Sequence, residues 1–122
     1  MPRRFLLSGL VVGCLLAPAS PADASAGWSD YYGDAGRVTV SPDRTRVTVC
    51  DLNARDDVEF KANYATHNPI DPRIYTVRAP QGGCDSGRSF ISWITVFKLC
   101  YRQNGFGGWD CNKPVWIKPR GR

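Results

Sequence analysis

The sequence predicts a small all-β domain, either an antiparallel β-sandwich or a partly open barrel, with about six strands and two disulfides. Several short segments alternate apolar and polar residues, which is the period of a strand that buries one face. Turn residues separate these segments at short intervals, and no stretch has the apolar spacing of an amphipathic helix. Four cysteines lie between Cys50 and Cys111, and an even number in a small exported chain favours disulfides.

The segment 89–102 (SFISWITVFKLCYR) is the longest apolar run outside the N-terminus. It is rich in aromatic and β-branched residues with a period of two, so we expect a long central strand. One face should be fully buried and the other partly buried. The first face would carry Ile91, Trp93, Thr95, Phe97, Leu99 and Tyr101, and the second Ile94, Val96 and Cys100.

Five shorter strands complete the expected fold, in segments 37–41, 45–50, 58–64, 73–78 and 115–118. The turn at Pro42-Asp43-Arg44 joins the first two into a hairpin, whose inward side chains would be Val38, Val40, Val47 and Val49. The third strand should have a solvated face with Glu59, Lys61 and Asn63. Segments 51–57, 65–72, 79–88 and 103–108 are expected loops, the last with an Asn-Gly turn signal. The closest general architecture is an Ig-like sandwich.

Residues 1–26 have the three parts of a secretory signal peptide in order: a basic start, an apolar run over 5–17, and small-residue cleavage sites at 22–26. The apolar run of about 13 residues is shorter than the ~20 that cross a bilayer. Cys14 lies in a lipobox-like setting, so acylation and anchoring there is the alternative. Residues 27–36 form a Gly- and aromatic-rich arm, either flexible or pinned by its rings, before the domain at 37–118 and a tail at 119–122.

The four remaining cysteines permit three pairings. Cys100 and Cys111 flank the expected hairpin tip, so a local bridge between them is geometrically easy. That leaves Cys50 to pair with Cys84. Each bridge would contribute roughly 2–4 kcal/mol, a large part of the about 5–15 kcal/mol that stabilises a typical domain, so reduction should largely unfold the protein.

Four segments in order carry a family resemblance: Val47-Thr48-Val49-Cys50-Asp51, Gly82-Gly83-Cys84, the run from Ile94 to Cys100, and Cys111 followed by Trp116. This pattern resembles a family of small exported proteins of actinobacteria. The resemblance implies an exported, disulfide-bonded β domain, and it implies no catalytic residues.

Composition argues against several functions. The formal net charge is +5, with 16 basic and 11 acidic residues that alternate along the chain, whereas nucleic-acid faces cluster Lys and Arg with aromatics. A specific nucleic-acid partner is therefore not expected, unless arginines such as Arg44, Arg46, Arg73, Arg78 and Arg88 gather in space. Mild attraction to anionic cell-wall polymers is compatible with this charge.

Catalytic and metal sites have few candidate residues. His67 is the only histidine, and a small secreted hydrolase or ribonuclease would need it beside Glu59 and an arginine, Arg55 or Arg73. Cys84-Asp85-Ser86-Gly87 is read as a turn beside a disulfide, not as a protease motif. Zinc lacks ligands, and the oxygens of segment 51–57 lack EF-hand spacing. No cofactor and no metal are expected.

Aromatic residues near the expected hairpin tip are the candidate binding residues: Tyr101, Phe106, Trp109 and Trp116. Exposed rings in a glycine-flanked loop can stack on sugars or fill a partner's pocket; alternatively, Trp109 and Trp116 fold back over a small core. We therefore expect a secreted, monomeric, non-catalytic module that binds a cell-wall polysaccharide or a protein. The alternatives are an inhibitor that presents the loop from Gln103 to Asp110 to an extracellular hydrolase, and the small hydrolase or ribonuclease above.

Overall fold

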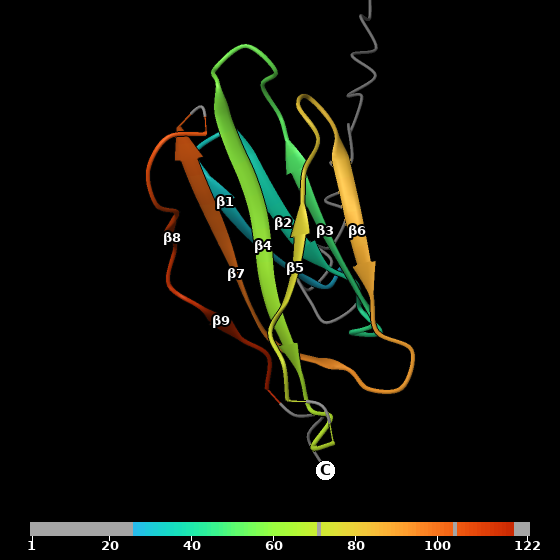
Figure 1. Ribbon diagram of the computed structural model, residues 1–122. Helices are drawn as coiled ribbons and strands as arrows, with labels where there is room; N and C mark the ends of the chain where they lie inside the picture. The colour runs from blue at the N-terminus through green and yellow to red at the C-terminus, as the bar shows by residue number, and fades with distance from the viewer. Residues whose placement is uncertain (1–25, 71, 104, 119–122) are drawn as a thin grey trace, which may run out of the picture.

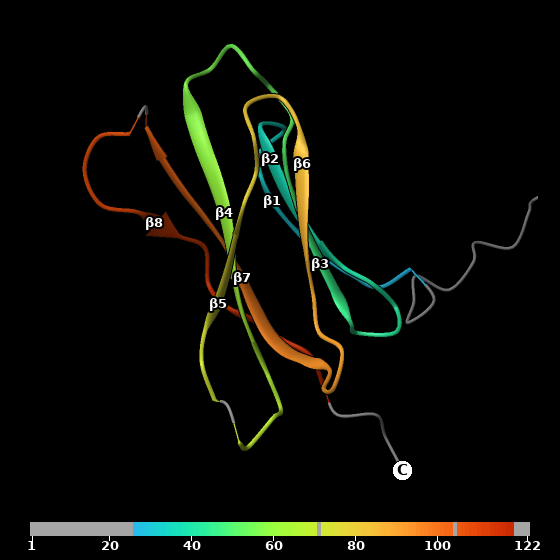
Figure 2. The ribbon, with the colours of Figure 1, turned by 45° about the vertical axis from the view of Figure 1, so that its right-hand side comes forward.

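The computed structural model describes residues 26–70, 72–103 and 105–118. The described residues form two antiparallel sheets that pack face to face, with no helix (Figure 1). Sheet A has the strand order β1-β2-β3-β6, and sheet B the order β5-β4-β7-β8, with β9 also paired to β7. Figure 2 shows the two layers side by side. The sequence-based prediction of an all-β antiparallel sandwich is therefore confirmed.

The strand bounds in sheet A are β1 Trp28–Tyr32, β2 Gly36–Val40, β3 Arg46–Asp51 and β6 Cys84–Arg88. Those in sheet B are β4 Val58–Thr66, β5 Tyr75–Arg78, β7 Ile94–Gln103, β8 Asp110–Cys111 and β9 Val115–Trp116. Each of the six expected strands overlaps one of these. Of the other three, β1 lies in the expected arm, β6 lies in the expected loop 79–88, and β8 lies where no strand was predicted.

The strand β6 was missed because its sequence carries no apolar alternation. It is an edge strand, paired only with β3, and most of its side chains are exposed. At Gly87, a Cβ would collide with the hydroxyl group of Tyr64. Position 87 must therefore be glycine, and β6 lacks the inward apolar side chain there that would have indicated a half-buried strand.

The long strand β7 begins at Ile94, so the predicted start at Ser89 is wrong. Ile91 and Trp93, which we expected on the buried face, are 90% and 48% exposed. The register with β4 shifts between Ala65 and Thr66. Because of this bulge, Ile94 is fully buried even though it has the opposite parity to Phe97.

The core lies between the sheets and follows the expected alternation. Sheet A contributes four buried valines from the β2–β3 hairpin: Val38, Val40, Val47 and Val49. Sheet B contributes Phe60, Ala62, Tyr64, Val77, Phe97 and Leu99, and Ile94 and Ile117 complete the cluster. The inward faces predicted for the hairpin and for β4 are confirmed.

Arg44 closes one end of the sandwich. This residue of the β2–β3 turn has a positive φ of 65° and is only 9% exposed. Its guanidinium donates a hydrogen bond to the carbonyl oxygen of Lys118 at 2.6 Å and lies 5.0 Å from the ring of Trp28. Its own carbonyl accepts the amide of Ile94. The side chain of Arg44 thus connects β1 to the C-terminal segment, and its backbone carbonyl connects the turn to β7.

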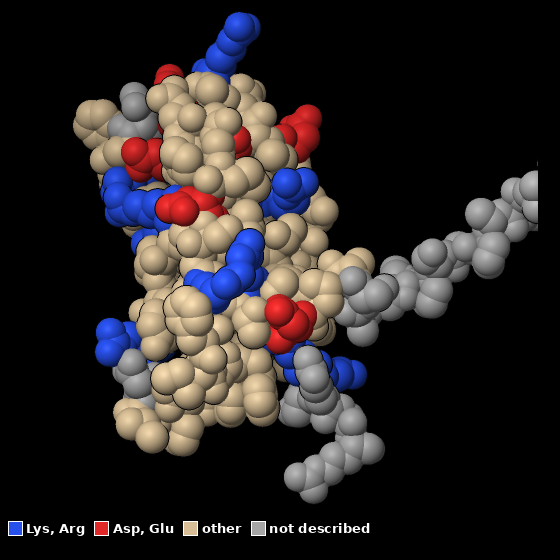
Figure 3. Space-filling view, turned by 90° about the vertical axis from the view of Figure 1, so that its right-hand side faces the viewer, with Lys and Arg blue, Asp and Glu red and all other residues tan. Residues whose placement is uncertain are grey.

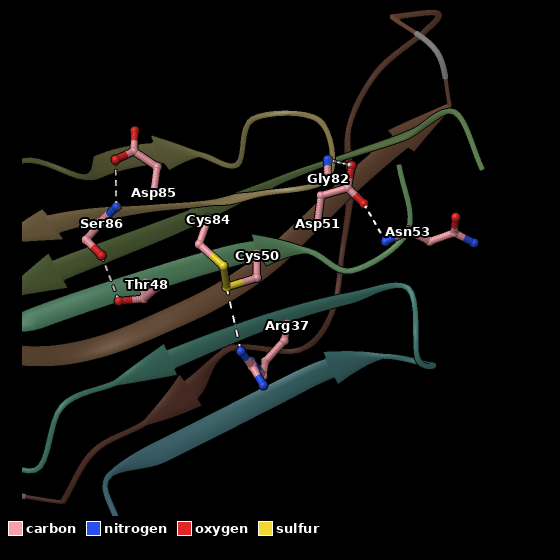
Figure 4. Close-up of a disulfide and its surroundings, with 9 residues drawn as sticks. All are labelled: Arg37, Thr48, Cys50, Asp51, Asn53, Gly82, Cys84, Asp85 and Ser86. Atoms are coloured by element: carbon pink, nitrogen blue, oxygen red, sulfur yellow. Dashed lines mark hydrogen bonds between the residues drawn. A yellow bond between two sulfur atoms is a disulfide. The ribbon is translucent and has the colours of Figure 1, made fainter. Parts of the chain in front are cut away.

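Both predicted disulfides are present, each between residues paired in register within one sheet. Cys50 bonds to Cys84 across β3 and β6, and Cys100 to Cys111 across β7 and β8. Beside the first bridge, Arg37 donates to the Cys50 sulfur at 3.7 Å (Figure 4). Two disulfides in so small a domain indicate folding in an oxidising compartment.

The expected signal peptide, including Cys14, and the tail at 119–122 lie outside the described residues, apart from Ala26. Among the described residues, no helix has the length and hydrophobicity that crossing a bilayer requires. The segment 27–36 contributes β1, which pairs along its whole length with β2.

We predict that Gly36→Ala destabilises the domain by about 1–3 kcal/mol, because the added Cβ would collide with the buried ring of Phe60. Urea unfolding followed by fluorescence measures the change. Gly108→Ala is the matched control, since a Cβ at Gly108 meets nothing within 4 Å. Equal stability of the two variants would contradict the packing at Gly36.

We predict that removing the Cys50–Cys84 bridge costs more stability than removing Cys100–Cys111. The sequence separations are 34 and 11 residues, so the loop-entropy model gives about 3.8 and about 2.8 kcal/mol. Double Cys→Ala variants compared by thermal unfolding test this order. The reverse order would show that strain or residual structure, rather than loop length, determines the effect.

Candidate functional site

Charged side chains gather on the outer face of sheet B, opposite the core. On β4, Glu59 and Lys61 alternate with the buried Phe60 and Ala62 and therefore point outward. Register pairing places Glu59 beside Arg102 of β7, and Lys61 between Arg78 of β5 and Cys100 of β7. The adjacent strands β5, β4 and β7 thus bring together cations that lie far apart in the sequence.

Trp109 lies over this group of cations. Its ring centroid is 4.4 Å from the Lys61 ammonium, 4.5 Å from the guanidinium carbon of Arg102, and 5.3 Å from that of Arg78. The tryptophan is half-buried and immediately precedes β8. Because Cys111 of β8 is bonded to Cys100, the disulfide fixes the backbone that carries the ring.

Immediately around the Trp109 ring, three cations lie beside one carboxylate, that of Glu59. Arg102 donates to the Glu59 carboxylate at 2.6 Å, which neutralises one of the three cations. The pKa of Lys61 is lowered by burial and then by the repulsion of Arg78, Arg102 and Lys98. The repulsion among these cations is the part of the shift that a nearby anion would reduce.

A pocket of about 300 Å³ opens beside Trp109, between segment 51–58 and segment 79–81. Its polar lining comes from Arg78 and Gln81 and from three carboxylates, those of Asp51, Asp57 and Glu59, and the tryptophan ring forms one wall. Asp57 has a positive φ of 57°, a conformation that Asp tolerates better than most residues. The volume is at the lower end of the range of small-ligand sites.

Asp51 holds the two loops of this pocket together. It is 6% exposed, and its carboxylate accepts the amides of Asn53 and Gly82, each at 3.1 Å (Figure 4). The Asp51 amide in turn donates to the Gly83 carbonyl. Because one buried side chain binds both loops, the pocket rim is preorganised.

The four aromatics proposed from the sequence do not form one site. Trp109 alone lines the pocket. Tyr101 turns to the inner side and packs on Tyr32 with ring centroids 4.1 Å apart. Phe106 is 80% exposed at the tip of the loop from Gln103 to Asp110, and Trp116 is 70% exposed on β9, so the expectation that Trp116 folds back is wrong.

The cations of the site were not among the predicted site residues. The outward orientation of Glu59 and Lys61 on β4 was predicted. Nothing in the sequence, however, indicated which strands would lie beside β4. Of the arginines that we considered as a cluster, Arg78 is at this site, Arg44 is buried, and Arg46 pairs with Arg88 on sheet A. They do not form one basic face.

His67 and Glu59 lie at opposite ends of β4. Glu59 is the second residue of the strand and His67 follows its end, a separation of roughly 26 Å for eight extended residues. His67 stacks on Trp93 at 3.6 Å, and its Nδ1 accepts the Trp93 amide at 3.1 Å. The hydrolase hypothesis required a cleft that unites these residues, and the geometry does not provide it.

The acidic loop after β3 is organised by hydrogen bonds to its own backbone. The side chains of Asn53 and Asp56 accept the amides of Arg55 and Val58, in addition to the contacts of Asp51. Within the described residues, no group of three or more His, Cys, Asp or Glu side chains is arranged to hold a metal ion.

Comparisons with family models, with curated proteins and with solved structures gave no significant match to this chain. We therefore infer the function from the geometry around Trp109.

We predict that Asp51→Ala destabilises the domain by about 1–3 kcal/mol, because two backbone amides lose a buried acceptor. Amide hydrogen exchange of Asn53 and Gly82 should accelerate. Asp85→Ala is the matched control, since the exposed Asp85 accepts only the amide of Ser86 among the hydrogen bonds described (Figure 4). Equal exchange rates in the wild type and Asp51→Ala would contradict the role of Asp51.

Proposed function

We propose that the protein is a secreted, non-catalytic binding module whose ligand is an acidic glycan of a cell surface. The observation that carries this proposal is the position of Trp109, which lies among Lys61, Arg78 and Arg102 at the edge of a polar pocket. The two disulfides support an extracellular location, since they persist in oxidising compartments.

A sugar ring fits the chemistry of this pocket. Its apolar C–H face packs on an aromatic ring, while its hydroxyl groups bind planar polar side chains. Trp109 supplies the aromatic wall, and Asp57, Glu59 and Gln81 supply acceptors and a donor. Gln81 already donates to the Ala54 carbonyl at 2.7 Å, which holds its amide in place at the rim.

Carboxylates line the pocket itself, but the cations beside the Trp109 ring favour a sugar that places an acidic group over Lys61 and Arg78. Arg102 is paired with Glu59, but Lys61 and Arg78 are adjacent cations across β4 and β5 and repel each other. A carboxylate or phosphate on the ligand would relieve this repulsion and form charge-assisted hydrogen bonds. The role of the protein would be attachment to, or recognition of, such a polymer.

We predict that Trp109→Ala weakens binding of an acidic polysaccharide by about tenfold or more, because the stacking wall is removed. Titration calorimetry with polygalacturonate, and with dextran as a neutral polymer, measures the effect.

Arg78→Gln should weaken binding of the acidic polymer and reduce the dependence of that binding on salt concentration.

Trp116→Ala is the matched control, because Trp116 lies on the same sheet, is 70% exposed, and does not line the pocket. It should leave affinity unchanged. Equal binding of both polymers by the wild type, or equal losses in Trp109→Ala and Trp116→Ala, would refute the proposed site.

A further inference from the structure

The Cys50–Cys84 disulfide lies on the outer face of sheet A, at one edge of the sandwich. Cys50 shares the parity of Thr48 on β3, opposite to the core-facing valines of the same strand. Cys84 begins β6, the edge strand that pairs only with β3. In Figure 1 this strand lies at the right-hand side of the molecule. The bridge therefore lies outside the core between the two sheets.

The two cysteines of this bridge differ in their access to solvent. Cys84 is exposed, as are most residues of β6. Cys50 is only 2% exposed although it lies on an outer face, because its register neighbours Arg37 and Cys84 lie on either side of it. Figure 3 views the molecule from the side of β6, where acidic and basic side chains are interspersed. A dissolved thiol therefore reaches the bridge at Cys84.

Arg37 places a positive charge against the buried sulfur. Its guanidinium donates to Cys50 Sγ at 3.7 Å (Figure 4). Among the described residues, no carboxylate forms an ion pair with Arg37, and its buried Nε has no hydrogen-bond partner. A disulfide sulfur gains little from a cation, whereas a thiolate gains a charge-assisted hydrogen bond. Arg37 is thus positioned to stabilise Cys50 as a thiolate once the bridge opens.

The second bridge has a different donor at its buried sulfur. Cys111 is exposed and Cys100 is fully buried, as in the first bridge. The group that donates to Cys100 Sγ, at 3.8 Å, is the uncharged amide of Asn63. Lys61 is the register partner of Cys100, but its ammonium lies over a tryptophan ring. Of the two buried cysteines, Cys50 is therefore expected to be the better leaving group.

We propose that the Cys50–Cys84 bridge is a site of thiol–disulfide exchange, at which a low-molecular-weight thiol becomes attached to Cys84. The incoming thiolate forms a bond with Cys84 Sγ while the Cys50–Cys84 bond breaks. The electron pair of that bond leaves on Cys50 as a thiolate, which Arg37 stabilises. The step needs no further oxidant or reductant. It is reversible, because Cys50 stays opposite Cys84 in the register of β3 and β6 and can expel the thiol again.

Exchange would loosen the edge of sheet A. It would open the ring that the bridge closes across a sequence separation of 34 residues. The strand β6 would then be held to β3 by backbone pairing and by the hydrogen bond between the Thr48 and Ser86 hydroxyls at 2.8 Å (Figure 4). The protein would thereby respond to thiols in its surroundings, and this response does not depend on the ligand of the Trp109 pocket.

Exchange with glutathione tests this proposal. The folded protein is incubated with excess reduced glutathione near neutral pH, quenched with acid at successive times, and analysed by mass spectrometry as intact protein and as peptides. One glutathione should appear on Cys84 before the Cys100–Cys111 bridge is modified. The rate should be proportional to the glutathione concentration and should not rise in low urea, because the exchange takes place in the folded state.

Arg37→Gln should slow the appearance of this adduct by about threefold or more, because the leaving thiolate loses its cation. Arg37→Lys retains the charge and should restore much of the rate. Arg46→Gln is the matched control, since it removes the same charge from the same outer face of sheet A, where Arg46 is exposed and pairs with Arg88. It should leave the rate unchanged. A variant that merely destabilised the fold would exchange faster, not slower.

Four outcomes would overturn the proposal. The first is the absence of a glutathione adduct on the folded wild-type protein, and the second is an equal rate in the wild type and Arg37→Gln. The third is modification of the Cys100–Cys111 bridge before Cys84. The fourth is a rate that increases with urea, because the reaction would then proceed through unfolded protein.

Discussion

The pairing of β4 with β7 is the constraint on which the rest of the structure depends. These two longest strands run antiparallel through the middle of sheet B and stay in register from Val58 to Ala65. Their inner faces supply much of the core, and their outer faces supply the charged site. Because side chains alternate, a slip of one residue would exchange the two faces. Phe60 would then meet water and Lys61 would be buried.

The same pairing gives the candidate site its rigidity. Glu59 meets Arg102 and Lys61 meets Cys100 because these residues are register partners, not because flexible side chains happen to reach one another. The second disulfide then extends sheet B by β8 and positions Trp109 over the cations. A site built on strands holds its geometry better than one built on loops alone, as the proposed binding of a ligand requires.

The sequence predicted those features that depend on local alternation and on cysteine spacing. The inward valines of the β2–β3 hairpin, the faces of β4 and both disulfides were anticipated correctly. The edge strand β6 was missed because Gly87 must be small beneath Tyr64. The cations around Trp109 were missed because they meet only through the pairing of β4 with β5 and β7. Strand order in a sandwich depends on contacts between distant segments, and no motif in the sequence indicates it. Residues 89–93 were wrongly predicted to be part of the long strand, because this exposed loop is as rich in apolar residues as a strand.

The Cys100–Cys111 bridge has a consequence for how the protein withstands proteases. The exposed segment from Gly105 to Gly108, where two glycines have positive φ, is the kind of loop that proteases cut first. A cut there opens the backbone within the ring that this disulfide closes, so neither fragment is released. Trp109 would remain attached through Cys111 to the central strand, and the nicked molecule would keep the surface around Trp109. A reducing gel would therefore separate the two fragments, whereas a non-reducing gel would show one intact molecule.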